Sequence, residues 1–184
     1  MMPNKSIERT AGKPALAMFK LQYIAAIIAT LVCADALATP RSQCSRDETV
    51  VFSCTAGRRI VSVCKLPSSG DAPLVLQYRA GRPNGALELV FPQEASPAAR
   101  NFRYRTEGRS AKGGIANLQF ENRGTTYTIF GFKHTFEGRY AGIQITVPSS
   151  QPVRLMCRNA SIVDNLYDIA DHDLSPLSSD EMVE

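Results

Sequence analysis

Apolar and polar residues alternate with a period of two along most of this 184-residue chain. The alternation occurs in nine short segments, at residues 50–54, 61–64, 74–79, 87–91, 102–105, 116–121, 125–132, 143–147 and 153–157. Successive side chains of a β-strand point to opposite faces, so each segment is predicted to be a strand with one apolar face. Turn-forming sequences such as GRPNG and NRG separate them. The pattern predicts an all-β fold, an antiparallel meander of about eight to nine short strands that forms a small soluble barrel or sandwich.

The segment 18–40, MFKLQYIAAIIATLVCADALATP, has the features of a secretory signal peptide. A lysine precedes an apolar run at 21–34 that is too short for a mature membrane helix, and alternating small residues follow it. Cleavage is expected after Ala36 or Ala38. Residues 1–38 are therefore predicted to be an N-terminal extension and signal that are removed. The protein is expected to be exported, either periplasmic or secreted, without stable insertion in a membrane afterwards.

The predicted mature chain, residues 39–184, holds four cysteines, Cys44, Cys54, Cys64 and Cys157. An even number of cysteines in an exported chain indicates two disulfides. A zinc site needs closely spaced ligands such as C-x-x-C, whereas these spacings are 10, 10 and 93 residues. Strand alternation places Cys54 and Cys157 on the inward faces of the first and last strands, and Cys64 on the opposite face of its strand. Of the three possible pairings, we therefore favour Cys54 with Cys157 and Cys44 with Cys64, and we expect no metal site.

Several stretches resemble a widespread family of exported bacterial proteins of unassigned function. They are ETVVFSCTAGRRIVSVC, LVLQYRAGRPNGALELVFP, GGIANLQFENRGTTYTIF, AGIQITV and the strand ending in LMC. The resemblance covers about residues 44–158, and its motifs are cysteines, turns and core positions. It implies a location in the bacterial cell envelope and an all-β fold, and it implies no catalytic residues.

The sequence lacks the usual catalytic motifs. A Ser or Cys nucleophile needs a base, usually His. The two histidines, His134 and His172, lie at a strand end and in an acidic segment, and no nucleophile elbow accompanies them. Glutamates such as Glu88 and Glu121 lie on polar strand faces, where solvated charges are expected rather than a glycosidase pair. Phosphate-binding and dinucleotide-binding motifs are also missing, so the chain is predicted not to be an enzyme and to use no cofactor.

Charge divides the mature chain into two parts. Residues 39–163, the disulfide-stapled β domain, carry 17 Lys and Arg against 8 Asp and Glu. Residues 164–184 carry seven acids and no Lys or Arg. Apolar residues spaced i, i+4 and i+7 predict a short helix at the beginning of this acidic tail, ending before a Ser-Pro pair, and the remainder is expected to be disordered.

The segment 100–112, RNFRYRTEGRSAK, concentrates five of the cations. Its arginines alternate with aromatic residues, which is compatible with a solvated strand face or with a surface for a polyanion. Nucleic acid is not expected as a partner of an exported protein. The loop at 107–114 is instead predicted to be a basic recognition element for an acidic cleft. The candidate binding residues are Arg103, Arg105, Arg109, Ser110 and Lys112.

Together these features predict an exported, non-catalytic binding protein of the bacterial cell envelope. Its expected partner is an envelope or secreted protein or a glycan, and inhibition or recognition of a glycan hydrolase is one form that such binding takes. Two alternatives stay open at this point. One is that the chain is a structural component of the envelope. The other is that it is a hydrolase whose site the sequence does not reveal.

Overall fold

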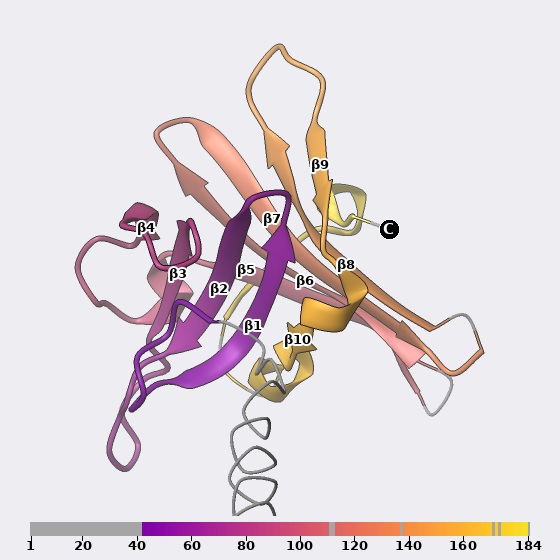
Figure 1. The fold of residues 1–184 in the computed structure, drawn as a ribbon. Helices are drawn as coiled ribbons and strands as arrows, with labels where there is room; N and C mark the ends of the chain where they lie inside the picture. Colours follow the sequence, from indigo (N-terminus) through magenta and orange to yellow (C-terminus); the bar gives the residue numbers. More distant parts are fainter. Residues whose placement is uncertain (1–41, 111–112, 137, 171, 173, 184) are drawn as a thin grey trace, which may run out of the picture. The chain divides into compact units, whose positions relative to one another are not determined.

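The computed structural model describes residues 42–183 except 111–112, 137, 171 and 173, so the predicted signal peptide lies outside the described residues. The described chain forms two β-sheets that pack face to face as a sandwich (Figure 1). Its helical segments are short 3₁₀ turns. The prediction of an all-β fold built mainly from antiparallel strands is confirmed, and of the two predicted architectures the sandwich is the one observed.

The first sheet has five strands in the order β10-β1-β2-β3-β4, and all neighbours are antiparallel. Turns or short loops connect β1 to β2 and β3 to β4, as the alternation predicts. Its strands have the bounds β1 Thr49–Ala56, β2 Arg59–Lys65, β3 Leu76–Gly81, β4 Leu87–Phe91 and β10 Val163–Asp164.

The second sheet has six strands in the order β11-β5-β6-β7-β8-β9. Strands β5 to β9 form an antiparallel meander, and β11 pairs with β5 in parallel. Its strands have the bounds β5 Arg103–Ser110, β6 Gly113–Asn122, β7 Thr125–His134, β8 Gly138–Thr146, β9 Val153–Met156 and β11 Ser175–Pro176.

The hydrophobic core lies between the two sheets and is rich in aromatic rings. Phe120 of β6 stacks on Phe91 with ring centroids 4.5 Å apart and on Tyr127 with centroids 4.9 Å apart. Phe102 meets Phe120 edge to face at 5.7 Å, and Tyr78 of β3 lies 4.8 Å from the same ring. Such ring pairs add to the free energy gained by burying the apolar surface.

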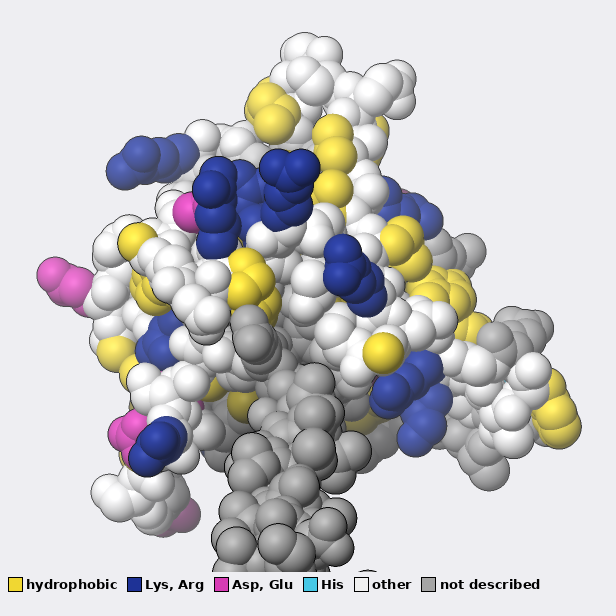
Figure 2. Space-filling model, viewed as in Figure 1, with side chains coloured by type: hydrophobic (Ala, Val, Ile, Leu, Met, Phe, Trp, Pro, Cys, Tyr) yellow, Lys and Arg dark blue, Asp and Glu magenta, His cyan; other side chains and the backbone are white. Residues whose placement is uncertain are grey.

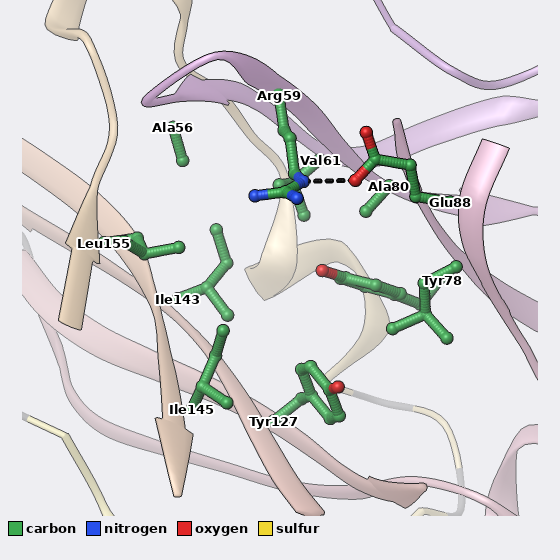
Figure 3. Close-up of a pocket in the computed structure, with 11 residues that line it drawn as sticks. Ala56, Arg59, Val61, Tyr78, Ala80, Glu88, Tyr127, Ile143, Ile145 and Leu155 are labelled. Atoms are coloured by element: carbon green, nitrogen blue, oxygen red, sulfur yellow. Dashed lines mark hydrogen bonds and ion pairs between the residues drawn. The ribbon is translucent and has the colours of Figure 1, made fainter. Parts of the chain in front are cut away.

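The core is incompletely filled at the end where β1 turns into β2. This turn carries the exposed Arg58 and Arg59, and Figure 2 shows Lys and Arg side chains gathered over this end of the hairpin. Beneath it, a cleft of about 320 Å³ opens between the sheets (Figure 3). The small side chains of Ala56 and Ala80 contribute to its lining, which is one reason why the sheets do not close there.

Both disulfides form with the pairing that the sequence pattern favours. Cys54 of β1 is bonded to Cys157, which directly follows β9, and this bond joins the two sheets. Closure of a meander into a barrel would require β1 to pair with β9 along its length, and it does not. The contact is an isolated bridge between Ala56 and Cys157, and β10 occupies the edge of β1 instead.

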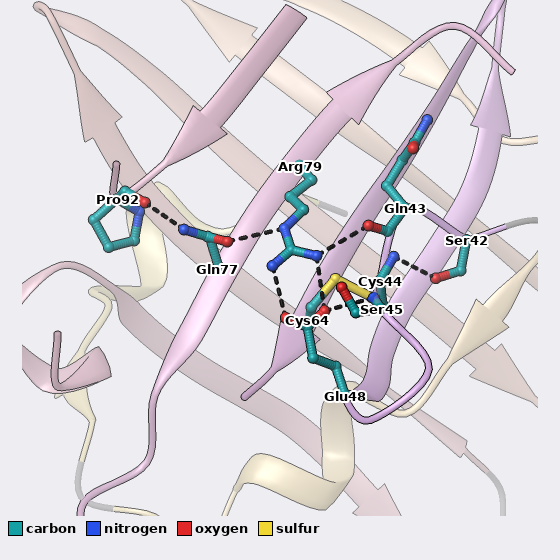
Figure 4. A network of polar contacts seen from close by, with 9 residues as sticks. All are labelled: Ser42, Gln43, Cys44, Ser45, Glu48, Cys64, Gln77, Arg79 and Pro92. Carbon is teal, nitrogen blue, oxygen red and sulfur yellow. Dashed lines mark hydrogen bonds and ion pairs between the residues drawn. A yellow bond between two sulfur atoms is a disulfide. The ribbon is translucent and has the colours of Figure 1, made fainter. Parts of the chain in front are cut away.

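The second disulfide, Cys44–Cys64, anchors the N-terminal segment on the outer face of the five-stranded sheet (Figure 4). Beside it, the Arg79 guanidinium donates to both Glu48 carboxylate oxygens at 2.7 Å. Arg79 also donates to the Gln77 side chain at 2.9 Å. The ion pair is largely buried, with the Glu48 side chain 7% exposed and that of Arg79 12% exposed.

The C-terminal segment belongs to the same compact unit as the β domain. Leu166 and Ile169 join the core between the sheets, β11 pairs with the edge of β5, and Val183 packs on the outer face of the six-stranded sheet. The sequence pattern predicts a short helix followed by disorder. The structure instead has the 3₁₀ turn η3 Leu166–Ile169, and it buries Leu177 and Val183. The Val183 N–H donates to Asn117 Oδ1 at 3.0 Å, and Asn117 Nδ2 donates to the Val183 carbonyl at 3.4 Å. Apolar anchors and paired polar groups together hold this segment in place.

Candidate functional site

Two of the predicted binding residues, Arg103 and Arg105, lie in β5. Arg103 forms an ion pair with Glu181 of the C-terminal segment. Arg105 Nε lies 3.0 Å from Glu107 Oε1, and its Nη1 donates to the Leu177 carbonyl at 3.4 Å. These two cations therefore contact the C-terminal segment of the same chain.

The other three predicted binding residues, Arg109, Ser110 and Lys112, belong to the β5–β6 hairpin. Arg109 and Ser110 end β5, but their side chains and the whole of Lys112 lie outside the described part of the chain. Backbone pairing of β5 with β6 continues to Ser110, opposite Gly113. Gly113 in turn lies opposite His134 of β7. The end of the β5–β6 hairpin is therefore next to the end of the β7–β8 hairpin.

The β7–β8 hairpin ends in a group of rings, Phe132, His134, Phe136 and Tyr140, which we call the aromatic hairpin end. Phe132 and Tyr140 are directly paired across the strands, and their rings stack with centroids 4.6 Å apart. His134 lies two residues along the same face, at 6.1 Å from Phe132. The ring of Phe136 meets His134 at 5.9 Å, and its side chain is 83% exposed. Stacked rings thus support one apolar side chain that projects into solvent.

Two cations flank the aromatic hairpin end. Lys133 and Arg139 are paired across β7 and β8, and both are exposed. Asp164 of β10 lies close by on the core side of β7, and a Cβ placed on Gly131 would lie 2.1 Å from its Oδ2. Glycine at this position therefore allows the close approach of Asp164 to the strand. Burial raises the pKa of Asp164, and the hydrogen bond from the Leu166 N–H together with the charges of Arg139 and Lys133 offsets this rise only in part.

Replacement of Asp164 by Asn is expected to stabilise the protein increasingly as the pH rises. A carboxyl whose pKa is raised by folding binds its proton more tightly in the folded state, so its contribution to stability is lost as the pH rises through the folded pKa. Asn does not titrate and keeps an oxygen that can accept the hydrogen bond from the Leu166 N–H. The melting temperature of Asp164→Asn minus that of the wild type is therefore expected to be larger at pH 7 than at pH 4. A difference in melting temperature that stays constant or falls between pH 4 and pH 7 contradicts a buried Asp164 carboxyl with a raised pKa.

One group of potential metal ligands is present in the described part of the chain. Cys44, Cys64 and Glu48 bring two sulfurs and a carboxylate oxygen within 4.8 Å of one another. The sulfurs are bonded to each other and offer no thiolate, and the carboxylate is bound by Arg79. This group is therefore structural rather than a metal site.

Among the described residues, no helix is both long enough and apolar enough to span a membrane. Comparisons of the chain with protein-family models, with curated proteins and with solved structures found no match. The resemblance to a family of exported bacterial proteins stays a prediction from the sequence motifs. The function is therefore inferred from the geometry of the surface and of the cleft.

Proposed function

We propose that this chain is an exported, non-catalytic binding protein of the cell envelope that docks onto an acidic protein surface through its aromatic hairpin end. The observation that carries the proposal is the exposure of Phe136, a large apolar side chain supported by stacked rings at the end of a hairpin. The sequence pattern located the recognition element in the neighbouring β5–β6 hairpin. The register of β6 with β7 brings the two hairpin ends together.

An exposed phenylalanine supported in this way is suited to act as an anchor. Burying a Phe side chain yields roughly 1.5–3 kcal/mol, which the folded chain by itself does not gain at Phe136. The stacking of Phe132 on Tyr140 and the contact of Phe136 with His134 support the projecting side chain before a partner arrives. An anchor that is ordered in advance loses less conformational entropy on binding. Aromatic residues are correspondingly frequent among the residues that dominate protein interfaces.

The charges around the anchor select the sign of the partner surface. Lys133 and Arg139 are exposed on the same hairpin. By sequence, Arg109 and Lys112 belong to the adjacent hairpin and Glu137 follows Phe136, so cations outnumber acids here. Opposite charges on two surfaces accelerate their encounter and exclude partners of the wrong sign. A carboxylate-rich surface with an apolar depression for Phe136 is the complement of this end of the molecule.

A protein partner fits the geometry better than a glycan. Phe132 and Tyr140 each stack one ring face on the other, which leaves less open ring face for a sugar to bind. Phe136 projects as a single side chain, and the same hairpin carries the exposed Lys133 and Arg139. Insertion of one apolar side chain into a pocket, with charges at the rim, is the usual anatomy of a protein interface.

Replacement of Phe136 by Ala is expected to weaken partner binding at least tenfold, because truncation of a hot-spot residue costs about 2 kcal/mol of binding free energy. The melting temperature is expected to stay unchanged, because the Phe136 side chain is exposed. The measurement begins with affinity capture by the purified protein from envelope and secreted proteins. The dissociation constant of the reconstituted complex is then determined at low and high salt. Replacing Lys133 and Arg139 by Gln is expected to lower the association rate mainly at low salt.

Val153→Ala provides the matched control, since Val153 is a 54% exposed apolar residue of β9. This variant is expected to bind like the wild type. Equal losses for Phe136→Ala and Val153→Ala, or no loss for Phe136→Ala, contradict the assignment of the interface. Capture of a polysaccharide that survives complete proteolysis of the extract contradicts a protein partner.

A further inference from the structure

From the cleft between the sheets we infer a second binding site, for a small amphipathic carboxylic acid whose apolar body enters the sandwich and whose carboxylate meets Arg59. This site is independent of the proposed protein interface. The cleft has a volume of about 320 Å³, at the lower end of the range of roughly 300–1,000 Å³ typical of small-molecule sites. Its size fits a single short acyl chain or a small ring system.

The walls of the cleft are apolar and come from both sheets. Ile143, Ile145 and Leu155 line it from β8 and β9, and Val61 lines it from β2 (Figure 3). Water in such a space finds few hydrogen-bonding partners, so an apolar ligand that displaces it is favoured.

The opening of the cleft is polar and carries an excess of positive charge. Arg59 contacts Glu88 through Nε, and Arg82 Nε lies 3.6 Å from the other oxygen of Glu88. Two guanidiniums thus share the carboxylate of Glu88, and Arg58 is also exposed at the same turn. A ligand with an anionic head complements this charge, whereas a cationic head is repelled.

Arg59 is placed to bind a carboxylate without releasing Glu88. A guanidinium has five N–H donors, and the contact with Glu88 uses the one on Nε. The side chain of Arg59 is 57% exposed and extends over the cleft (Figure 3). Charge-assisted hydrogen bonds from arginine to a carboxylate are about twice as strong as neutral ones.

Tyr78 supplies a further polar group in the lining of the cleft. Its hydroxyl points towards Arg59 in Figure 3. Burial raises the pKa of Tyr78 further above its already high ordinary value, so the hydroxyl is protonated near neutral pH and can donate a hydrogen bond. A hydroxyl that points towards Arg59 favours a ligand with an acceptor atom near its head over a pure hydrocarbon.

The test compares three ten-carbon probes, namely decanoate, decanol and decyltrimethylammonium, titrated into the purified protein by calorimetry. The two ionic probes are kept below their micellar concentrations and decanol below its solubility limit. We expect decanoate to bind about tenfold more tightly than decanol. The cationic probe is expected to show no saturable binding. Equal affinity for all three probes, or no saturable binding of decanoate at millimolar concentration, overturns the inference.

Two variants locate the site. Arg59→Gln is expected to reduce decanoate affinity about tenfold and to leave decanol affinity unchanged. Ala80→Leu fills the cleft and is expected to abolish binding of both probes, provided that its circular dichroism spectrum matches that of the wild type. Leu155→Phe, which fills the cleft from the other sheet, serves the same purpose if Ala80→Leu does not fold.

The exposed Arg46 lies outside the cleft lining, so Arg46→Gln is the matched charge control and is expected to bind like the wild type. A loss in Arg46→Gln equal to that in Arg59→Gln indicates general attraction of anions and overturns the site. Phe136→Ala is expected to leave decanoate binding unchanged. Failure of the cleft and failure of the protein interface are therefore separate results.

Discussion

Replacing Cys54 and Cys157 together by alanine is expected to lower the free energy of unfolding by about 4–5 kcal/mol. The bond closes a loop across a sequence separation of 103 residues. A disulfide stabilises mainly by restricting the unfolded chain, and this effect grows with the logarithm of the loop length. The bond also joins β1 to the residue after β9, next to the isolated bridge between Ala56 and Cys157. The measurement is urea unfolding of the variant and the wild type.

The second disulfide provides the matched control. Cys44–Cys64 has a sequence separation of 20 residues, and its removal is expected to cost about 3 kcal/mol by the same relation. The variant lacking Cys54 and Cys157 is thus expected to have the lower midpoint in urea. The reverse order indicates that loss of local packing around Cys44, rather than loop length, dominates and contradicts this account.

Strand alternation is sufficient to predict most of the sandwich. The face on which a side chain lies follows from its position in the strand. Cys54 and Cys64 lie ten positions apart on the two arms of a hairpin with a two-residue turn, and alternation correctly assigns them to opposite faces of the sheet. That assignment leads directly to the two disulfides that form. Alternation, however, predicts only which residues of a single strand share a face. It does not show that the strands separate into two sheets between β4 and β5.

Alternation also does not say what covers a polar face. It predicts that Asn117 and Gln119 face solvent, yet both are buried, because the outer face of the six-stranded sheet is covered. The C-terminal segment contributes to this cover through Val183 and Leu177. The sequence signal for this packing is weak. It consists of isolated apolar residues within an acidic tail, opposite a basic strand.

The candidate sites are predictable from the sequence only in part. The sequence points to the β5–β6 hairpin because its cations are close together in the chain. The aromatic hairpin end depends on the pairing of Phe132 with Tyr140, and the cleft depends on residues such as Ala56 and Ile143 that are far apart in sequence. Contacts of this kind follow from the arrangement of the strands and not from any local pattern.

Glu48→Ala is expected to be strongly destabilising, with a loss of about 3–5 kcal/mol in the free energy of unfolding. The Glu48 and Arg79 side chains are largely buried and joined by two hydrogen bonds of 2.7 Å. Removing the carboxylate leaves the guanidinium without its counter-charge in a place that water reaches poorly, which costs more than the pair itself contributed. Glu88→Ala is the matched control. Its pairs with Arg59 and Arg82 are exposed, so a loss several times smaller is expected in the same urea unfolding measurement.

The effect of Glu48→Ala is also expected to depend on pH. Burial acts to raise the pKa of Glu48, but hydrogen bonds from Arg79 and from the Ser45 N–H, together with the Arg79 charge, outweigh it and hold the pKa below its usual value. A carboxyl with a lowered folded pKa contributes stability above its unfolded pKa of about 4.3, and this contribution is lost as the pH falls through the folded value. The difference in unfolding free energy between the wild type and Glu48→Ala is therefore expected to be full at pH 7 and to shrink below pH 4. A difference that is small at pH 7, or one that grows on acidification, contradicts a stabilising ion pair between Glu48 and Arg79.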